Sequence, residues 1–153
     1  MNEIWTPHLT VAAIIEQAGQ FLLVEEHSEG RVVLNQPAGH VEENENLTDA
    51  VVRETLEESG RHFSPEAITG LYRWRSPLNG VTYLRVAFCG SCSARDRDIE
   101  LDADIITTHW LSRDDIDARS RQLRSPLVRR CVDDYLAGQR YPLDLINEPK
   151  APD

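Results

Sequence analysis

Four charged residues near the middle of the chain, Arg53, Glu54, Glu57 and Glu58, have a spacing that could do chemistry. On a helix, which turns by about 100° per residue, the three glutamates fall within an arc of about 100°. Like charges at this spacing destabilise a helix, so folding alone does not explain them. Three converging carboxylates are instead typical of a site for a hard divalent cation.

Mg²⁺ is the cation that these carboxylates favour, with Mn²⁺ as a substitute. Mg²⁺ prefers oxygen ligands, takes few carboxylates, and shares its coordination with waters and substrate phosphates. The alternative is an acidic helix face that is merely solvated, because glutamate pairs are common on surfaces. A calcium-binding protein of the EF-hand type is not indicated, since the sequence lacks that loop pattern.

A helix must present the glutamates, and the sequence predicts one that ends at Ser59. Asn46 is a suitable N-cap with Asp49 three residues later, and Gly60 supplies the C-terminal stop. The opposite face of this helix is expected to pack against a sheet, while the carboxylates stay on the open side. That packing face consists of Thr48, Val52, Thr55, Leu56 and Ser59.

Strands are expected on both sides of this helix. The β-branched and apolar runs that predict them are Leu9–Ile15, Phe21–Val24, Val32–Leu34, Ile68–Trp74, Thr82–Phe88 and Ile105–Leu111. Pro37 and Gly39 predict a loop over 36–40. Two more helices are expected, a short one from Arg113 after the cap Ser112, and a second one from Pro126 to about residue 137. The chain looks irregular from about residue 139.

The order of these elements predicts an α/β fold. Helices interspersed with about six strands, some joined by hairpins, indicate a mixed β-sheet that is covered on both faces, which is a three-layer α/β/α sandwich. The 153 residues, 41% hydrophobic and 27% charged, have the size and composition of one globular domain, so we expect a single domain over 1–153.

The charge and the hydropathy pattern exclude several classes of partner. A formal net charge of −10 opposes binding to DNA or RNA polymers, and it would repel a nucleotide unless a cation lay between them. No apolar run is long enough to span a membrane and no signal-peptide pattern is present, so we expect a cytoplasmic protein. The absence of coiled-coil heptads favours a monomer.

The three cysteines do not predict a zinc site. Cys89 and Cys92 have C-x2-C spacing, but the chain offers no second cysteine pair or paired histidines to complete four ligands. We expect Cys89 and Cys92 to be buried or edge thiols near the end of a strand.

Residues 39–60 resemble the Nudix box, G-x5-E-x7-R-E-U-x-E-E-x-G-U, where U is a bulky apolar residue. Seven polar or glycine positions match without a gap, and they are Gly39, Glu45, Arg53, Glu54, Glu57, Glu58 and Gly60. The two U positions hold Thr55 and Arg61 and depart from the pattern. The resemblance implies a Nudix-like α/β/α sandwich and a hydrolase that cleaves organic diphosphates with water.

The resemblance also implies roles for the box residues. The metal ligands of the family correspond to Glu54, Glu57 and Glu58, with the carbonyl oxygen of Gly39 as a further ligand. Arg53 and Glu45 would support these ligands without touching the metal; the alternative for both is an ordinary surface ion pair.

The residue that accepts the proton of the attacking water is left open between Glu57 and Glu54. Members of the family also bring in an acidic residue from the region before Trp110, for which Asp104 is expected here as a further metal ligand. The alternative for Asp104 is a solvated aspartate in an acidic loop.

Four stretches outside the box are similar to the NudJ-type phosphatases, a bacterial subgroup of the Nudix hydrolases. They are 7–12, 35–40, 123–128 and 138–143. This similarity implies release of orthophosphate from nucleoside tri- and diphosphates or from pyrimidine pyrophosphates such as hydroxymethylpyrimidine pyrophosphate and thiamin pyrophosphate.

Arg124, Arg140, Tyr72 and Trp74 are the expected substrate contacts. The guanidinium groups suit phosphate, and the aromatic rings could stack on a base. The alternative for the aromatics is core packing, because they alternate along a predicted strand.

Two other functions remain open from the sequence. One is a pyrophosphohydrolase that cuts ADP-ribose or dinucleoside polyphosphates and yields a nucleoside monophosphate. The other is a catalytically silent nucleotide-binding regulator, which would be expected to have lost box carboxylates; here the polar box is complete.

Overall fold

The computed structural model describes residues 2–150 and contains seven strands in that range, one more than expected. In chain order they are β1 (His8–Gln17), β2 (Gln20–Ser28), β3 (Arg31–Asn35), β4 (Ala38–His40), β5 (Phe63–Arg75), β6 (Thr82–Cys92) and β7 (Ile105–Ser112). The helices are α1 (Leu47–Ser59), α2 (Arg113–Ala118) and α3 (Pro126–Leu136), with short 3-10 turns η1 (Ser120–Gln122) and η2 (Leu143–Leu145).

The sheet is mixed and consists of two parts that meet at the β1–β2 hairpin. In the first part, β1 is parallel to β6 and antiparallel to β4, while β6 is antiparallel to β5. In the second part, β2 lies between β3 and β7 and is antiparallel to both. The two parts are paired only beside the hairpin turn, where Glu16 and Gln17 face Phe21 and Gln20, so they separate beyond it.

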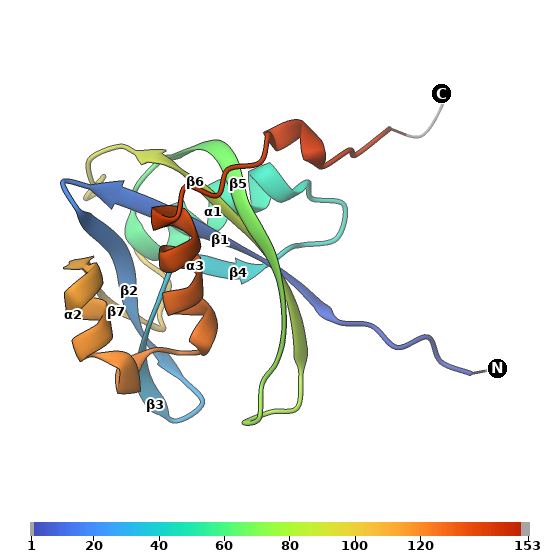
Figure 1. Ribbon diagram of the computed structural model, residues 1–153, viewed down its shortest axis with the longest axis horizontal. Helices are drawn as coiled ribbons and strands as arrows, with labels where there is room; N and C mark the ends of the chain where they lie inside the picture. The colour runs from blue at the N-terminus through green and yellow to red at the C-terminus, as the bar shows by residue number, and fades with distance from the viewer. Residues whose placement is uncertain (1, 151–153) are drawn as a thin grey trace.

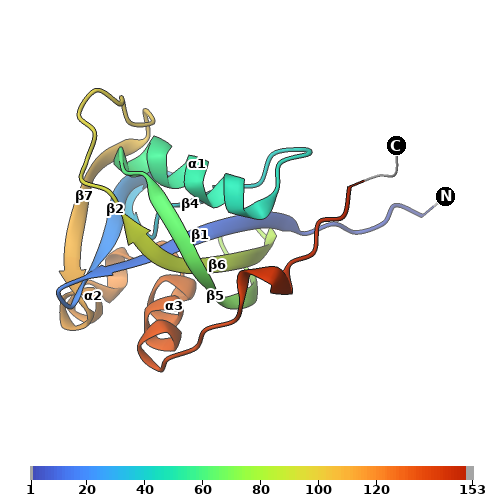
Figure 2. The same cartoon turned by 90° about the horizontal axis from the view of Figure 1, so that it is seen from above.

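Helices cover both faces of the sheet, and the predicted three-layer α/β/α sandwich is confirmed. Figures 1 and 2 show α1 on one face and α3 on the other, with α2 next to β7. The alternation of side chains along β1 serves both layers, because Val11 and Ala13 join the apolar cluster with α1, whereas Ile14 joins the cluster with α3. The core therefore lies on both faces of one sheet.

The helix α1 begins and ends where the sequence predicts. The side chain of Asn46 accepts a hydrogen bond from the Asp49 N–H at 2.8 Å, and Gly60 adopts a left-handed conformation with φ 70°. Glycine adopts the left-handed backbone conformation without strain. The helix therefore ends at Ser59, and the chain turns toward β5.

The buried face of α1 differs from the prediction. Thr55 and Ser59 are buried as expected, but the other three predicted packing residues are only partly buried. The buried residues of α1 are Ala50, Val51, Glu54, Thr55, Glu58 and Ser59. Because α1 contacts β1, β4 and β5 and also touches β7, protein covers more than one side of it. Two of the box carboxylates are thus enclosed rather than open to water.

Two segments predicted to be irregular have regular structure. The predicted loop contains β4, which pairs with β1 so that Gly39 faces Val11, despite the glycine and the preceding proline. The chain after residue 139 is tied to the sheet, because Tyr141 and Ile68 exchange two backbone hydrogen bonds of 2.8 Å before η2. Tertiary pairing overrides local sequence preference in both places.

The N-cap of α1 can be tested by Asn46→Ala. This substitution removes the acceptor of the Asp49 N–H and should lower the free energy of unfolding by about 0.5–2 kcal/mol. Urea unfolding followed by circular dichroism would measure the change. Asn147→Ala, on an exposed residue whose side chain makes one long bond of 3.5 Å, is the matched control and should leave stability unchanged.

Candidate metal and substrate site

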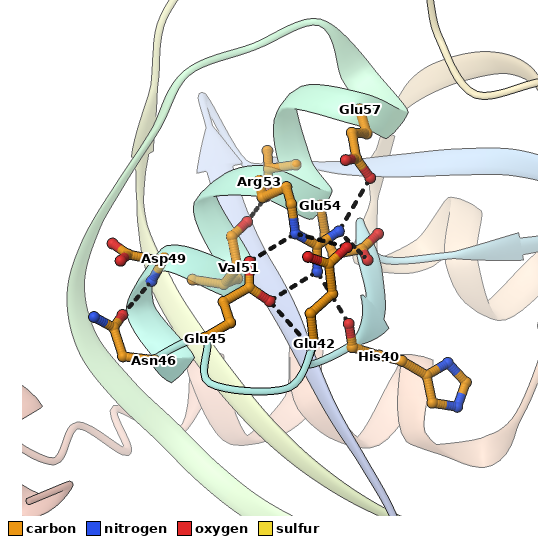
Figure 3. Close-up of polar contacts among 10 residues, drawn as sticks. His40, Glu42, Glu45, Asn46, Asp49, Val51, Arg53, Glu54 and Glu57 are labelled. Carbon is orange, nitrogen blue, oxygen red and sulfur yellow. Dashed lines mark hydrogen bonds and ion pairs between the residues drawn. The ribbon is translucent and has the colours of Figure 1, made fainter. Parts of the chain in front are cut away.

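Arg53 of α1 is the centre of a hydrogen-bond network (Figure 3). Its Nε and Nη2 donate to the two carboxylate oxygens of Glu45 at 2.7 and 2.9 Å. Its Nη1 donates to Glu54 at 2.8 Å and to Glu57 at 3.1 Å, and its Nη2 also donates to the carbonyl of His40 at 3.0 Å. The bond to Arg53 lowers the pKa of Glu45, and the same bond raises the pKa of Arg53. One guanidinium group thus holds the box glutamates against β4.

Gly39 lies directly against the carboxylate of Glu54. A Cβ atom at residue 39 would overlap that carboxylate, so the position requires the absence of a side chain. Its backbone conformation does not require glycine, because its φ is not positive. This close approach places the backbone of Gly39, whose carbonyl oxygen we predicted as a ligand, beside the box carboxylates.

Glu54, Glu57 and Asp102 bring their carboxylates together. One oxygen from each lies within 4.8 Å of the others, which is the only group of this kind found among residues 2–150. Asp102 comes from the segment between β6 and β7, and its N–H donates to the carbonyl of Glu57 at 2.9 Å. The acidic residue from this segment is therefore Asp102 and not the predicted Asp104, whose carbonyl accepts the His27 N–H instead.

The donors in this group fit a hard divalent cation. All three offer oxygen, the element that Mg²⁺ prefers, and three ligands leave positions for water and phosphate. Burial raises the pKa of Glu54, while the bond from Arg53 opposes that effect. Arg53 alone does not balance the negative charges that meet here, so a cation among these oxygens would relieve their repulsion.

Glu58 does not belong to this group, although it was predicted as a ligand. Its carboxylate accepts the Ala38 N–H at 2.8 Å, and the residue is 7% exposed. Burial raises the pKa of Glu58 well above its usual range, and the charges of Glu26, Glu54 and Asp102 act in the same direction. Glu58 thus joins α1 to β4 through a hydrogen bond and remains within electrostatic reach of the other carboxylates.

Glu26 of β2 is a buried carboxylate that the sequence analysis missed. It is 5% exposed and accepts a hydrogen bond from Nη1 of Arg124 at 2.7 Å. Its position two residues after Val24 and four after Leu22, both buried, places it on the same face of the strand. Because Phe21–Val24 are buried on both faces of β2, alternation alone could not distinguish Glu26 from Glu25 in the sequence. The pairing of β2 with β7 is irregular at this point, between Glu25 and Glu26.

A pocket lies on the other side of β4. Ala38 and His40 line it from β4, and Arg124 lines it from the segment before α3. Trp74 of β5 also lines it and stacks on Tyr83 of β6, with ring centroids 6.5 Å apart and an angle of 20° between the rings. Two of the four predicted substrate contacts, Arg124 and Trp74, therefore reach a pocket that adjoins the box.

The other two predicted substrate contacts lie elsewhere. Tyr72 is buried in the core beneath α3, and its hydroxyl donates to Asp134 at 2.7 Å, so the core-packing alternative describes it. Arg140 packs over the ring of Tyr135 at 4.0 Å and donates to the carbonyls of Tyr135 and Gln139. Neither residue lines the pocket beside β4. Period-two alternation could not distinguish Tyr72 from Trp74, because both lie on the same face of β5.

The two positions that depart from the box pattern are accommodated by local contacts. Thr55 is fully buried, and its hydroxyl donates to the carbonyl of Val51 at 2.8 Å, so no buried polar atom lacks a partner there. The guanidinium group of Arg61 lies 5.2 Å from the ring centre of Trp110, which is a cation–π distance. Nη1 of Arg61 also donates to the carbonyl of Ser93 at 3.1 Å, while its buried Nε has no hydrogen-bond partner within residues 2–150.

The cysteines are free thiols, as predicted. Cys89 and Cys131 are buried and Cys92 is partly buried. In the described range no helix is both long and apolar enough to cross a membrane.

Comparison with known proteins agrees with the fold and the box. The NUDIX domain family matches residues 6–131. The chain is 37% identical to "Phosphatase NudJ" of Escherichia coli strain K12 over 145 residues, which covers 95% of this chain and 94% of that protein. It is 48% identical to a solved NUDIX hydrolase from Nitrosomonas europaea, with a TM-score of 0.92 and coverage of 94% of this chain and 98% of that one.

A more distant neighbour is the NUDIX domain of Shewanella oneidensis NrtR, solved in complex with ADP-ribose. Its TM-score is 0.70 at 15% identity, over 88% of this chain and 90% of that one, so it shows the shared fold alone.

The chain belongs to the Nudix hydrolase family. Within that family it resembles the phosphatases named NudJ, and it is an enzyme that acts on phosphoanhydrides.

The contact between Gly39 and Glu54 can be tested by Gly39→Ala. The added methyl group would displace the Glu54 carboxylate and lower metal-dependent turnover by about 10–100-fold, the range for residues that orient ligands. Steady-state kinetics at several metal concentrations would measure it, with circular dichroism as the check on folding. A folded Gly39→Ala variant with wild-type turnover would show that activity does not depend on the location of the Glu54 carboxylate beside Gly39.

The buried charge of Glu58 can be tested by Glu58→Gln in metal-free protein. Glutamine keeps an acceptor for the Ala38 N–H but carries no charge. Because the folded-state pKa of Glu58 is raised, the wild type loses stability as the pH rises from the usual glutamate pKa of 4.5 through that raised pKa. We expect the variant to be more stable by about 1–3 kcal/mol at alkaline pH, with no difference near pH 4.5.

Thermal melts at a series of pH values would measure this difference. A variant that is less stable than the wild type at alkaline pH would contradict the expectation. Glu66→Gln, on an exposed strand residue, is the control for loss of one negative charge.

Proposed function

We propose that this enzyme hydrolyses nucleoside tri- and diphosphates and related organic diphosphates with Mg²⁺ and releases orthophosphate. Hydroxymethylpyrimidine pyrophosphate and thiamin pyrophosphate belong to the proposed substrates. The observation that carries the proposal is the group formed by Glu54, Glu57 and Asp102 next to a pocket lined by arginine. The similarity to relatives named "Phosphatase NudJ" supports terminal phosphate release over other cleavage patterns.

Glu54, Glu57 and Asp102 would hold the cation, with the Gly39 carbonyl as a further ligand. When bound, Mg²⁺ neutralises charge on phosphate oxygens and lowers the pKa of water in its coordination. The residues of the chain keep the ligands in place, since Arg53 bonds both Glu54 and Glu57. Mn²⁺ offers similar coordination to oxygen ligands and would substitute.

Glu57 is the carboxylate that we assign as the acceptor of the water proton. Its side chain is 40% exposed, whereas that of Glu54 is 11% exposed, so water reaches Glu57 more readily. Arg53 donates to one oxygen of Glu57 at 3.1 Å and leaves the other oxygen without a bond from it. A carboxylate oxygen has two lone pairs, so the oxygen of Glu57 that Arg53 leaves open can bind the cation and also accept the proton of a water beside it.

Arg124 would bind phosphate groups of the substrate, where the substrate extends from the metal site into the pocket beside β4. It lines the pocket, and its ion pair with the buried Glu26 holds one of its nitrogens at 2.7 Å. The side chain is 40% exposed, so its other donors remain open to a ligand. Planar guanidinium groups bind phosphate through paired hydrogen bonds, and this suits the expected substrate.

The remaining alternatives make different products. A pyrophosphohydrolase of ADP-ribose or dinucleoside polyphosphates would release a nucleoside monophosphate, and a silent binding module would release nothing. The complete set of box carboxylates favours an enzyme. Three statements stay predictions: a cytoplasmic location, a monomeric state, and no nucleic-acid polymer among the partners. The net charge of −10 supports the last of these.

Product analysis with Glu57→Gln tests the proposal. The wild type, given Mg²⁺ and a panel of nucleoside tri- and diphosphates, ADP-ribose and hydroxymethylpyrimidine pyrophosphate, should release orthophosphate, and a chelator should abolish release. Glu57→Gln should lower the turnover number at least about 100-fold, the contribution of a general base. Glu66→Gln, the exposed control, should keep wild-type turnover.

Release of nucleoside monophosphate without orthophosphate would replace the proposal by the pyrophosphohydrolase alternative. Full turnover by folded Glu57→Gln would remove Glu57 from the mechanism.

A further inference from the structure

Arg85 of β6 is a buried cation whose partners are neutral. It is 6% exposed, its Nη1 donates to Oε1 of Gln36 at 2.9 Å, and its Nη2 donates to Oδ1 of Asn35 at 3.0 Å. Within residues 2–150 it forms no ion pair, whereas the nearby Arg124 is paired with Glu26. A buried charge without a counter-charge is unfavourable, so stability of the free protein does not explain a guanidinium group here.

The side chain of Arg85 is held in a fixed direction by the two amides. Gln36 is 1% exposed, and its Nε2 donates to the carbonyl of Val128 at 2.7 Å, which leaves its Oε1 facing Arg85. Asn35 is 3% exposed and accepts the second nitrogen. Nη1 of Arg85 also contacts the Sγ of Cys131 at 3.9 Å; since a guanidinium group has five N–H donors, these three bonds still leave others for a ligand.

Arg85 lines the pocket beside β4 at its buried end. It lies on the same face of β6 as Tyr83, two residues earlier, which stacks on Trp74. Its pairing partner on β1 is Thr10, which also lines the pocket and pairs in turn with His40 of β4. The pocket therefore extends from the box strand to the buried Arg85 as its floor, with Trp74 and Tyr83 also in its lining.

The charges of the lining are divided between the opening and the floor. Arg31 and Arg124 are more exposed than Arg85, and Glu29 is the one acidic residue of the lining. This excess of positive charge occurs in a chain whose net charge is −10. The exposed arginines suit phosphate groups, which keep some water, whereas burying a phosphate dianion at the floor would be costly. A planar ring with neutral acceptors fits the floor at less cost.

We propose that Arg85 determines substrate specificity by donating hydrogen bonds to carbonyl or ring-nitrogen acceptors of a planar heterocycle that enters this pocket. The proposal rests on the proposed function, since the diphosphate of the same molecule would lie at the box. The ring would lie near Trp74 and Tyr83, and its acceptors would take the place of water on the donors of Arg85 that Asn35 and Gln36 leave open. A ligand without such an acceptor forms no hydrogen bond with Arg85, so Arg85 does not increase its binding affinity.

Binding of nucleoside monophosphates in the presence of chelator tests this role without depending on turnover. Uridine, cytidine and adenosine 5′-monophosphates carry a heterocycle, and ribose 5-phosphate is the comparator without one. Calorimetry should show that Arg85→Gln weakens binding of the preferred nucleotide at least about tenfold, the loss of one bond from a charged donor. Binding of ribose 5-phosphate should be unchanged.

Two further variants make the result specific. Arg85→Lys keeps the charge but loses the fork of donors and should bind with intermediate affinity. Arg73→Gln, on an exposed residue of β5, is the charge-matched control and should behave as wild type. Thermal melts establish that each variant is folded. If Arg85→Gln does not fold, the nucleotide affinity of Arg85→Lys relative to the wild type is the test.

The proposal is overturned if the wild type binds nucleotides no more tightly than ribose 5-phosphate. It is also overturned if Arg85→Gln weakens both ligands equally, because Arg85 would then bind phosphate. Absence of hydrolysis with every substrate would refute the proposed function alone, since the binding comparison still decides the role of Arg85. With an active wild type, Arg85→Gln should raise KM for nucleotides and leave kcat within about twofold.

Discussion

The fork of hydrogen bonds around Arg53 is the interaction on which the rest of the site depends. Carboxylates from one helix face repel each other, and a helix without a central cation would turn them outward to water. Arg53 contacts Glu45, Glu54 and Glu57 and also the carbonyl of His40, so the same group fixes the acids and docks the helix on β4. The short strand, the helix and the loop between them are thereby held as one unit.

The negative charge of the carboxylates in and near this unit is neutralised only in part, and this affects both the stability of the protein and its chemistry. Glu58 and Glu26 are buried carboxylates, and burial raises the pKa of Glu58 while Arg124 pairs with Glu26. Groups kept in this state work against folding of the metal-free chain, as active sites often do. The same repulsion gives a divalent cation a reason to bind, because the cation relieves it. Folding and metal binding are therefore expected to be coupled through a few side chains on α1 and β2.

Local patterns in the sequence were enough to predict the helix α1, its caps and the three-layer fold. Asn46, Gly60 and the glutamate spacing act within one or two helical turns, where local rules are strong. The predictions that failed depend on pairing between distant segments. The strand β4 forms by pairing with β1, where Val11 faces Gly39. Asp102 reaches the box because its N–H donates to the carbonyl of Glu57 near the end of α1. Arg140 packs on Tyr135. No spacing rule reports such contacts.

The three residues of β4 form a thin wall with different chemistry on its two sides. The missing side chain of Gly39 leaves room for the carboxylate of Glu54 on one side, and all three residues line the pocket whose far end is Arg85. The residues proposed for bond cleavage and for ligand choice thus come largely from different strands and helices, which meet at this wall and at the ion pair of Arg124 with Glu26. Substitutions on β5 and β6 can retune which molecules are accepted while the hydrolytic apparatus on α1 stays as it is. Such a partition gives the scaffold a short evolutionary route to new substrates.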